Sequence, residues 1–420
     1  MTLVKFGILR LAILYFLLLI VFTLSIIAVN YIPKAAIKNN VAFSAEQIDK
    51  EGLYKKIANF KLFQLDNYTD VLMLNIALSG DPKMAIESSM MAYWYKSTNY
   101  LALAKDTKKN ALGDFSDLNK ESYGRYWHGY LIVLKPLLCF FDYGQIRIIN
   151  YFIFLLLFIV SSYLIYKRLG GKIMSYFIAS FCLINVFIIP LSMQFSNMFY
   201  LAFISIIYLL KCEQKFTNNT NAILFFFALG GLTSYFDFLT TPLVTLGLPL
   251  TIYFLIDKSN KSVQNFFILS LFWFFGYSSI WASKWLMGVF LTNKDFLTSV
   301  FQQVKLRTSS SYKGMDMTLF NIVVFCYTIL IKKKIFFTIV VIFFILCFSS
   351  IAFLIKRNVK LFRENLPYIA IFLLFPVWFL FLRNHTIQHG WFTWRTIVIM
   401  IFSIQIFLSN MIEYTKANKI

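Results

Sequence analysis

Apolar residues occur in long runs along most of this chain, and short polar or basic connections separate the runs. A helix needs about 20 apolar residues to cross the hydrocarbon core of a membrane, although several runs here are shorter. The runs predict an all-α polytopic membrane protein with about ten transmembrane helices. We place the helices at 6–30, 146–166, 173–190, 197–211, 222–236, 240–256, 265–281, 335–355, 367–382 and 394–409.

Two stretches interrupt this pattern and are expected to lie outside the membrane. Residues 32–145 contain no long apolar run, and we predict a first extracytoplasmic loop there within a single membrane domain, 1–420. Residues 282–334 form the second extracytoplasmic segment. Its apolar part, 319–331, is short and ends in three lysines. We treat that part as an interfacial helix, because counting it as a span would move the basic loop around 356–363 outside.

Composition and charge support the membrane assignment. The chain is 59% hydrophobic and 14% charged, with 49 Phe, which excludes an ordinary soluble domain. The net charge of +21 is read as cytoplasmic loop charge rather than as a nucleic-acid-binding surface. The first apolar run is expected to be a retained anchor with its N-terminus inside, in the cytoplasmic (inner) membrane. The five Cys show no CxxC or His-Cys spacing, so neither a disulfide framework nor a zinc site is predicted.

Two carboxylates in the first loop are the leading candidates for chemistry. Asp66 and Asp70 precede an apolar run, and their spacing places both on one face if the segment is helical. On the pair alone, a structural interpretation is favoured, with Asp66 as the helix N-cap and Asp70 in the first turns. The other polar residues of the chain favour the catalytic alternative only if they collect on the same side.

Under the predicted topology, the other informative polar residues lie on the same side of the membrane as Asp66 and Asp70. The centres of the spans carry almost no ionisable residues, whereas a transport pathway usually needs them. All three His fall on the expected outer face. The outer candidates are Arg125, Tyr126, Trp127 and His128 in the first loop, Gln194 and Asn197, Tyr235 and Asp237, and then His385, His389, Trp391 and Arg395.

Structural alternatives remain open for these residues. The aromatic-basic segment 123–130 is also typical of a belt at the membrane interface. Gln194 and Asn197 suit hydrogen bonding at a helix end. Asp237 is either a helix cap or a buried acid with Arg395 or Arg125 as its partner. His385 and His389 have metal-ligand spacing on a helix, but no third ligand is evident.

Taken together, these segments resemble the GT-C superfamily of integral-membrane glycosyltransferases. Asp66 and Asp70 match the acidic motif of the first outer loop in kind and position, although they are four residues apart rather than adjacent. The segments 126–130, 235–240 and 385–395 look like those of bacterial membrane proteins of this kind. The resemblance implies jaw-like interfacial helices in the first loop and a site on the extracytoplasmic face.

The resemblance also implies a reaction. A sugar would move from a polyprenyl-phosphate donor to a glycan, lipid or protein acceptor of the cell envelope, with inversion. Asp66 is expected to be the general base, with Asp70 orienting the acceptor or sharing a cation. Arg395 is the first candidate for the donor phosphate, ahead of Arg125, His128, His385 and His389. Sugar or acceptor contacts are expected from Tyr126, Trp127, Gln194, Asn197, Tyr235, Asp237 and Trp391.

No cofactor is required for this chemistry, although Mg²⁺ or Mn²⁺ held by Asp66 and Asp70 is compatible with it. Besides the lipid-linked donor and the acceptor, the expected partners are membrane lipids and no nucleic acid. Alternatives from other classes are an O-antigen-type ligase or polymerase, a flippase or transporter of lipid-linked oligosaccharides, and a non-catalytic scaffold. The sequence alone does not identify the sugar or the acceptor.

Overall fold

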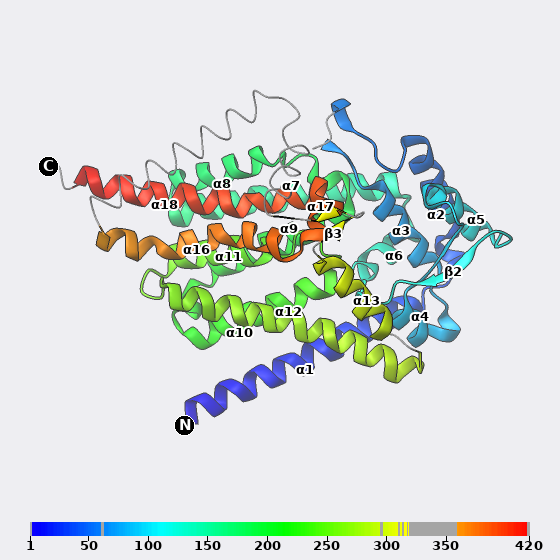
Figure 1. Cartoon of the computed structure of the whole chain (residues 1–420), viewed down its shortest axis with the longest axis horizontal. Helices are drawn as coiled ribbons and strands as arrows, with labels where there is room; N and C mark the ends of the chain where they lie inside the picture. Colours follow the sequence, from blue (N-terminus) through cyan, green and yellow to red (C-terminus); the bar gives the residue numbers. More distant parts are fainter. Residues whose placement is uncertain are drawn as a thin grey trace.

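The structure is a computed structural model that describes residues 2–59, 63–294, 297–309, 311, 312, 315, 316, 318 and 359–417. The described part is mainly helical, which confirms the predicted class. Its long apolar helices form what we call the apolar bundle, and residues 31–142 form what we call the cap region. The two parts lie at opposite ends of the long axis, and α1 begins and α18 ends at the end away from the cap region (Figure 1).

The apolar bundle consists of α1 (Thr2–Asn30), α7 (Tyr143–Leu169), α8 (Gly171–Leu183), α9 (Met193–Lys211), α10 (Asn219–Phe236), α11 (Val244–Ile256), α12 (Val263–Thr292), α16 (Val359–Phe381) and α18 (Ile397–Ala417). Short helices connect it: η5 (Ile189–Leu191), η6 (Glu213–Thr217), α13 (Leu297–Thr308), α17 (Arg383–Thr393) and η7 (Trp394–Thr396). A small antiparallel pair, β3 (Ser311–Tyr312) and β4 (Met315–Asp316), follows α13.

The cap region consists of α2 (Lys34–Glu51), η1 (Ile57–Asn59), α3 (Asn67–Leu78), η3 (Pro82–Met84), α4 (Ala85–Met91), β1 (Tyr93–Lys96), η4 (Tyr100–Ala102), α5 (Leu103–Leu112), β2 (Asn119–Ser122) and α6 (Leu131–Leu138). β1 and β2 pair antiparallel. One buried amide joins three of these elements. Asn75 on α3 donates to the Tyr95 carbonyl at 2.8 Å, accepts from the Tyr95 amide at 2.9 Å and donates to Thr107 on α5 at 3.0 Å.

Six helices of the described part are long and apolar enough to cross a membrane, consistent with a polytopic membrane protein. They are Gly7–Asn30, Tyr143–Leu169, Met193–Lys211, Val263–Thr292, Val359–Phe381 and Arg383–Ile412, and two shorter apolar helices are Gly171–Leu183 and Val244–Ile256. The predicted total of ten remains a prediction, because the span at 335–355 and the interfacial helix at 319–331 lie outside the described residues.

Several predicted boundaries were wrong, and three of them show local features of the chain. The span placed at 173–190 ends at Leu183, because Asn185 adopts a left-handed conformation (φ 58°) and Pro190 follows in η5. α9 begins at Met193 instead of residue 197, directly after Ser192. α12 continues without a break to Thr292, so the segment predicted to leave the membrane at residue 282 begins as helix.

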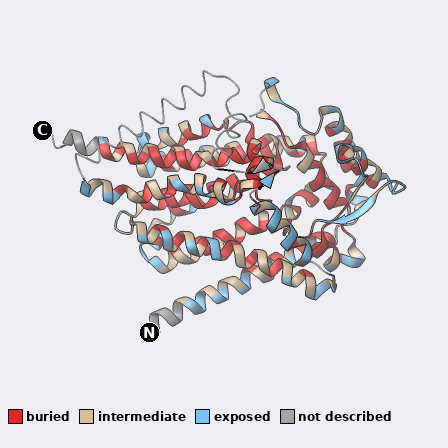
Figure 2. Cartoon of the chain, in the orientation of Figure 1, coloured by how far each residue is buried: buried red, intermediate tan, exposed pale blue. Residues whose placement is uncertain are grey.

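Burial differs between the helices of the apolar bundle. Figure 2 shows mostly buried positions along α18, whereas α1 carries many exposed ones. The exposed positions of α1 and α7 include large apolar side chains: Ile8, Phe16, Ile20, Phe152 and Leu156. Apolar helix faces of this extent are stable in hydrocarbon and unstable in water. They therefore support lipid contact for these two helices.

Small residues let α10 and α12 approach closely. A Cβ atom added at Gly230 would lie 1.9 Å from the Trp273 carbonyl oxygen, and one at Gly276 would lie 2.0 Å from the Phe227 carbonyl oxygen. The two helix backbones are therefore in direct contact at these glycines, as is common for helix pairs in membranes.

Gly276→Val should separate the two helices and destabilise the protein by about 1–3 kcal/mol. The added side chain would meet the Phe227 carbonyl, which cannot move unless α10 moves with it. Thermal unfolding in detergent would measure the loss. Gly171→Ala is the matched control, since its added Cβ would lie 3.7 Å from the nearest atom, in the Tyr166 ring. Equal unfolding temperatures for the Val variant and wild type would contradict the close packing.

A buried lysine joins the apolar bundle to the cap region. The Lys284 ammonium on α12 donates to the Ser89 carbonyl at 2.7 Å and to the Met90 carbonyl at 3.0 Å, at the end of α4. It also lies 5.4 Å above the Trp127 ring. A cation at the last carbonyls of a helix satisfies acceptors that the helix itself leaves open. Lys284 therefore fixes α4 on α12.

Candidate functional site

Asp66 begins α3 at the border between the cap region and the apolar bundle. Its carboxylate accepts from the Thr69 amide at 3.2 Å and from the Thr69 hydroxyl at 2.8 Å, which confirms the N-cap interpretation. The side chain is only 3% exposed. Burial raises the pKa of Asp66 to about 7; the nearby charge of Asp70 adds to this, while the Thr69 hydrogen bonds and the positive charge of Arg395 oppose it.

Asp70 lies one turn further along α3 and connects to a different element. Its carboxylate accepts from the Ser192 hydroxyl at 2.7 Å and from the Gln194 amide at 3.5 Å, at the beginning of α9. It is fully buried, and burial raises its pKa while hydrogen bonds from Tyr143 and Ser192 oppose the rise. A carboxylate at the N-terminus of a helix is favoured by the helix dipole. Asp70 thus ties α3 to α9, and its acceptor positions are directed at protein donors.

Arg395 lies in η7, the short break between α17 and α18. It is 1% exposed, and its guanidinium carbon lies 4.4 Å from the centre of the Phe195 ring on α9. Its positive charge opposes the rise in the pKa of Asp66, so the guanidinium lies within electrostatic range of that carboxyl. The break in the helix thus holds this cation within electrostatic range of an acid from the cap region. The structure therefore brings together the two residues that the sequence ranked first as base and as phosphate ligand.

The loop after α10 closes one side of this site. Asp237 caps the end of α10 and accepts from the Thr240 amide at 2.9 Å, while Gln194 donates to the Thr240 hydroxyl at 3.1 Å. Burial raises the pKa of Asp237 to about 7, against hydrogen bonds from the loop amides. The carboxylate thus accepts from backbone amides of the loop and from the Thr240 side chain, and Asp237 occupies the C-cap position of α10, as the helix-cap interpretation expects.

Several buried polar atoms around this loop have no hydrogen-bond partner among the described residues. They are Gln194 Oε1, Ser234 Oγ, Asp237 Oδ2, Thr241 Oγ1, Thr393 Oγ1, Trp394 Nε1 and Thr396 Oγ1. Buried polar atoms are normally satisfied, so a group of them at one place calls for an explanation. They belong to the start of α9, the end of α10 with the loop that follows it, and the segment 393–396 that contains Arg395.

The two histidines of α17 lie side by side, and Arg307, which was not predicted from the sequence, contacts one of them, His385. The His385 and His389 rings are 4.7 Å apart. His385 Nδ1 lies 3.1 Å from Arg307 Nη1, and His385 Nε2 lies 2.8 Å from the Leu239 carbonyl. Arg307 can only donate, so Nδ1 accepts and the proton is on Nε2. His385 is therefore neutral in this arrangement and adds no positive charge.

The aromatic-basic segment lies against α12. The Arg125 guanidinium carbon is 4.0 Å from the centre of the Tyr123 ring, and Tyr126 stacks on Trp281 at 5.6 Å. His128 is buried, with Nε2 2.9 Å from the Tyr123 carbonyl, and burial lowers its pKa to about 3. It is neutral at ordinary pH, so as a phosphate ligand it would add no positive charge. Arg125 keeps its charge and remains a candidate.

Two rings predicted to contact sugar have packing roles instead. Trp127 is fully buried and donates to the Ile280 carbonyl at 2.8 Å. Tyr235 stacks on Phe22 of α1 at 4.1 Å and leaves no room for a side chain at Gly129, whose added Cβ would lie 2.4 Å from that ring. Both rings hold α1, α10 and α12 against the cap region.

Asn197, another residue predicted to contact sugar or acceptor, lies one turn inside α9 and is half-buried.

Trp391 is the predicted sugar contact that packs on Phe195, the ring against which Arg395 lies. Its ring is half-buried, 6.3 Å from Phe195 and 5.9 Å from Tyr54 of the cap region. Tyr54 in turn stacks on Tyr68 at 6.0 Å, with the two rings nearly parallel. The sequence analysis missed both tyrosines. Tyr68 lies inside the acidic segment itself, which is the one signal that could have revealed it.

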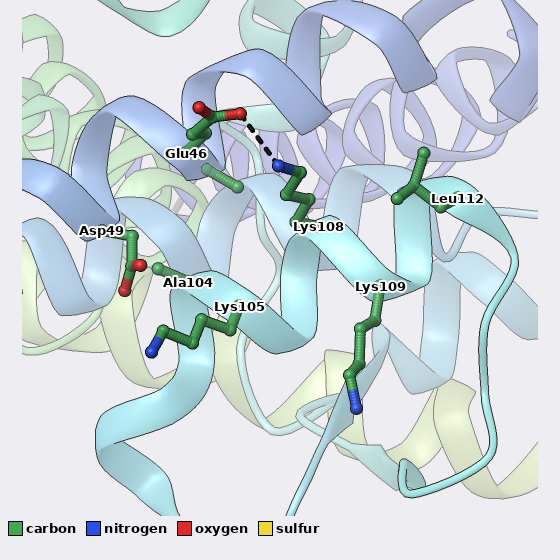
Figure 3. A pocket seen from close by; sticks show the side chains of 8 residues that line it. Glu46, Asp49, Ala104, Lys105, Lys108, Lys109 and Leu112 are labelled. Carbon is green, nitrogen blue, oxygen red and sulfur yellow. Dashed lines mark hydrogen bonds and ion pairs between the residues drawn. The ribbon is translucent and has the colours of Figure 1, made fainter.

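Metal binding finds no further support in the geometry. Within the described ranges, no group of three or more His, Cys, Asp or Glu is placed to hold a metal ion. Asp66 and Asp70 direct their hydrogen bonds to different partners. A separate shallow hollow of about 260 Å³ lies between α2 and α5, where Glu46 pairs with Lys108 and other lysines line the rim (Figure 3). None of the residues that line it belongs to the site around Asp66.

Comparison with protein-family models, with curated proteins and with solved structures finds no match for this chain. The arrangement of the site therefore carries the functional argument. It consists of a buried carboxylate at a helix start, a buried guanidinium at a helix break, and partly exposed aromatic rings beside them.

Proposed function

We propose that this protein is a glycosyltransferase of the cytoplasmic membrane, active at the extracytoplasmic face. Its donor would be a sugar on a polyprenyl phosphate, and its acceptor a hydroxyl of a cell-envelope glycan, lipid or protein. The observation that supports this best is that buried Asp66 and buried Arg395 lie within electrostatic range of each other, where the cap region meets the apolar bundle. A lipid-linked substrate has to present its reacting group at such a border, with its tail in the bilayer.

The chemistry follows from these two groups. Asp66 takes the proton of the acceptor hydroxyl as the oxygen forms a bond to the anomeric carbon. The bond from that carbon to the phosphate oxygen breaks, and the polyprenyl phosphate leaves with the electron pair. Arg395 stabilises the charge that gathers on the leaving phosphate, because its fork of donors matches phosphate oxygens. Attack opposite the leaving group inverts the anomeric configuration.

Supporting groups surround this pair. Asp70 holds α3 against α9 and thereby sets the position of Asp66. Arg125 and Arg307 supply further positive charge on the donor side, from the segment before α6 and from α13. No divalent cation is needed for a single-phosphate leaving group, although the proposal is compatible with Mg²⁺ or Mn²⁺.

The test uses the full chain in nanodiscs, with radiolabelled undecaprenyl-phosphate sugars and an extract of membrane glycans. Wild type should form a new glycosidic product. Arg395→Gln should lower the rate by about 10²–10³-fold, the usual effect of losing a hydrogen-bond donor that stabilises the transition state. Arg395→Lys keeps the charge and should retain more activity than Arg395→Gln.

Arg168→Gln is the control, because this residue lies at the far end of α7 in an exposed pair with Glu213. It should leave the rate unchanged. The absence of product with every polyprenyl-phosphate sugar would refute the proposal, as would full activity of folded Arg395→Gln. Movement of the donor across the bilayer without a new bond would instead identify a transporter.

A further inference from the structure

Three aromatic side chains form a surface beside Asp66, which we call the aromatic platform: Tyr54, Tyr68 and Trp391. Tyr54 comes from the connection between α2 and α3, Tyr68 from the first turn of α3, and Trp391 from α17. The Tyr54 and Tyr68 rings are stacked with an interplanar angle of 8°, and Trp391 meets Tyr54 edge-on at 88°. The platform therefore bridges the cap region and the apolar bundle across the site.

The backbone holds Tyr54 in place. α2 ends at Glu51 and is capped by Gly52, whose φ of 86° suits glycine, and the chain then folds back along the start of α3. The Leu65 amide donates to the Lys55 carbonyl at 2.9 Å, and the Tyr68 amide donates to the Leu53 carbonyl at 3.1 Å. These bonds on both sides of Tyr54 fix its ring over Tyr68.

The platform is partly exposed, whereas Asp66, within electrostatic range of both tyrosines, is buried. Tyr54 is 39% exposed, and Tyr100 in η4, which interacts electrostatically with both tyrosine hydroxyls, is 60% exposed. Burial raises the pKa of Tyr68 to about 12, and the Asp66 carboxylate adds to the shift. Both platform hydroxyls therefore stay neutral and can donate hydrogen bonds.

We propose that the aromatic platform binds a pyranose ring of a carbohydrate acceptor, so that one of its hydroxyls reaches Asp66. A pyranose has an apolar C–H face that fits an aromatic ring, and hydroxyls at its rim that fit the tyrosine hydroxyls and the carboxylate. This inference deepens the proposed function and rests on it for the role of Asp66. It selects a glycan over a protein or a simple lipid as the acceptor.

The test measures binding without any donor. Saturation-transfer NMR on the full chain in nanodiscs would use methyl glycosides of hexoses and N-acetylhexosamines, and their disaccharides. At least one of these probes should bind wild type saturably, and Tyr54→Ala should raise its Kd by about tenfold, the loss expected for one stacking ring. Tyr54→Phe keeps the ring and loses only the hydroxyl, so its Kd should rise less than that of Tyr54→Ala.

Tyr31→Ala is the matched control, because Tyr31 is also exposed, at 61%, and follows α1 away from these ring contacts. It should leave binding unchanged. Failure of every probe to bind wild type, or equal affinity of Tyr54→Ala and wild type, would overturn the inference. Saccharide binding that depends on Tyr54, with no transfer from any donor, would refute the proposed enzyme but not this binding site.

Discussion

Replacing Asp66 with asparagine should lower the rate of sugar transfer by about 10²–10⁴-fold, the usual contribution of a general base. The substitution is well suited to isolate that role. Asparagine is nearly the same size and is as good an N-cap as aspartate, so its side-chain oxygen can still accept from Thr69. α3 should therefore begin at the same residue, and the loss should appear in the chemical step rather than in folding.

The pH dependence gives this prediction a second readout. The carboxyl of Asp66 has its pKa raised to about 7. A base acts in its deprotonated form, so the wild-type rate should rise about tenfold between pH 6 and pH 8 and then level off. The residual activity of Asp66→Asn should lack this rise.

Although Asp66→Asn should lower the transfer rate, it should raise the thermal stability of the protein. Because the folded pKa lies above the ordinary value of 3.8, Asp66 contributes stability at pH below about 4 and loses it as the pH rises through about 7. Asp66→Asn should therefore gain thermal stability relative to wild type between pH 5 and pH 8. Asp81→Asn, at the exposed cap of η3, is the control for both readouts. Unchanged transfer by Asp66→Asn would remove this residue from the mechanism.

Replacing Asp70 with alanine should cause the largest loss of stability among the site variants. The carboxylate accepts from Ser192 and Gln194 and is hydrogen-bonded by Tyr143, all at buried positions. Each donor left without a partner costs about 1–3 kcal/mol. α3 and α9 would also lose their direct polar link, so Asp66 would no longer be held at a fixed distance from Arg395.

Thermal unfolding and transfer per folded molecule should both be measured for this variant. Asp70→Asn keeps an acceptor for Ser192 and should be the milder change. Asp49→Ala on the exposed face of α2 is the control and should stay within about 0.5 kcal/mol of wild type. An Asp70→Ala protein as stable as wild type would show that α3 and α9 are held together by packing alone.

Local rules in the sequence were sufficient to predict much of the architecture. The apolar runs identified helical segments, because a helix in hydrocarbon must satisfy its own backbone and present apolar side chains all around. The start of α3 at Asp66 followed from N-cap preference, which involves only neighbouring residues. The boundary errors at Asn185 and at Thr292 also have local causes, a left-handed residue in the first case and an uninterrupted helical run in the second.

The directions in which the side chains point depended on tertiary structure. Asp66 and Asp70 are one turn apart, yet Asp66 lies within electrostatic range of Arg395, whereas Asp70 binds the start of α9. Both pairs of aromatic residues consist of one Trp and one Tyr, yet their positions differ. Trp127 and Tyr235 pack in the core, whereas Tyr54 and Trp391 lie at the partly exposed platform. Sequence periodicity records which residues share a helix face. Which distant segment covers that face is set by packing between α3, α9 and η7, and that packing decides which of the two acids lies within electrostatic range of Arg395.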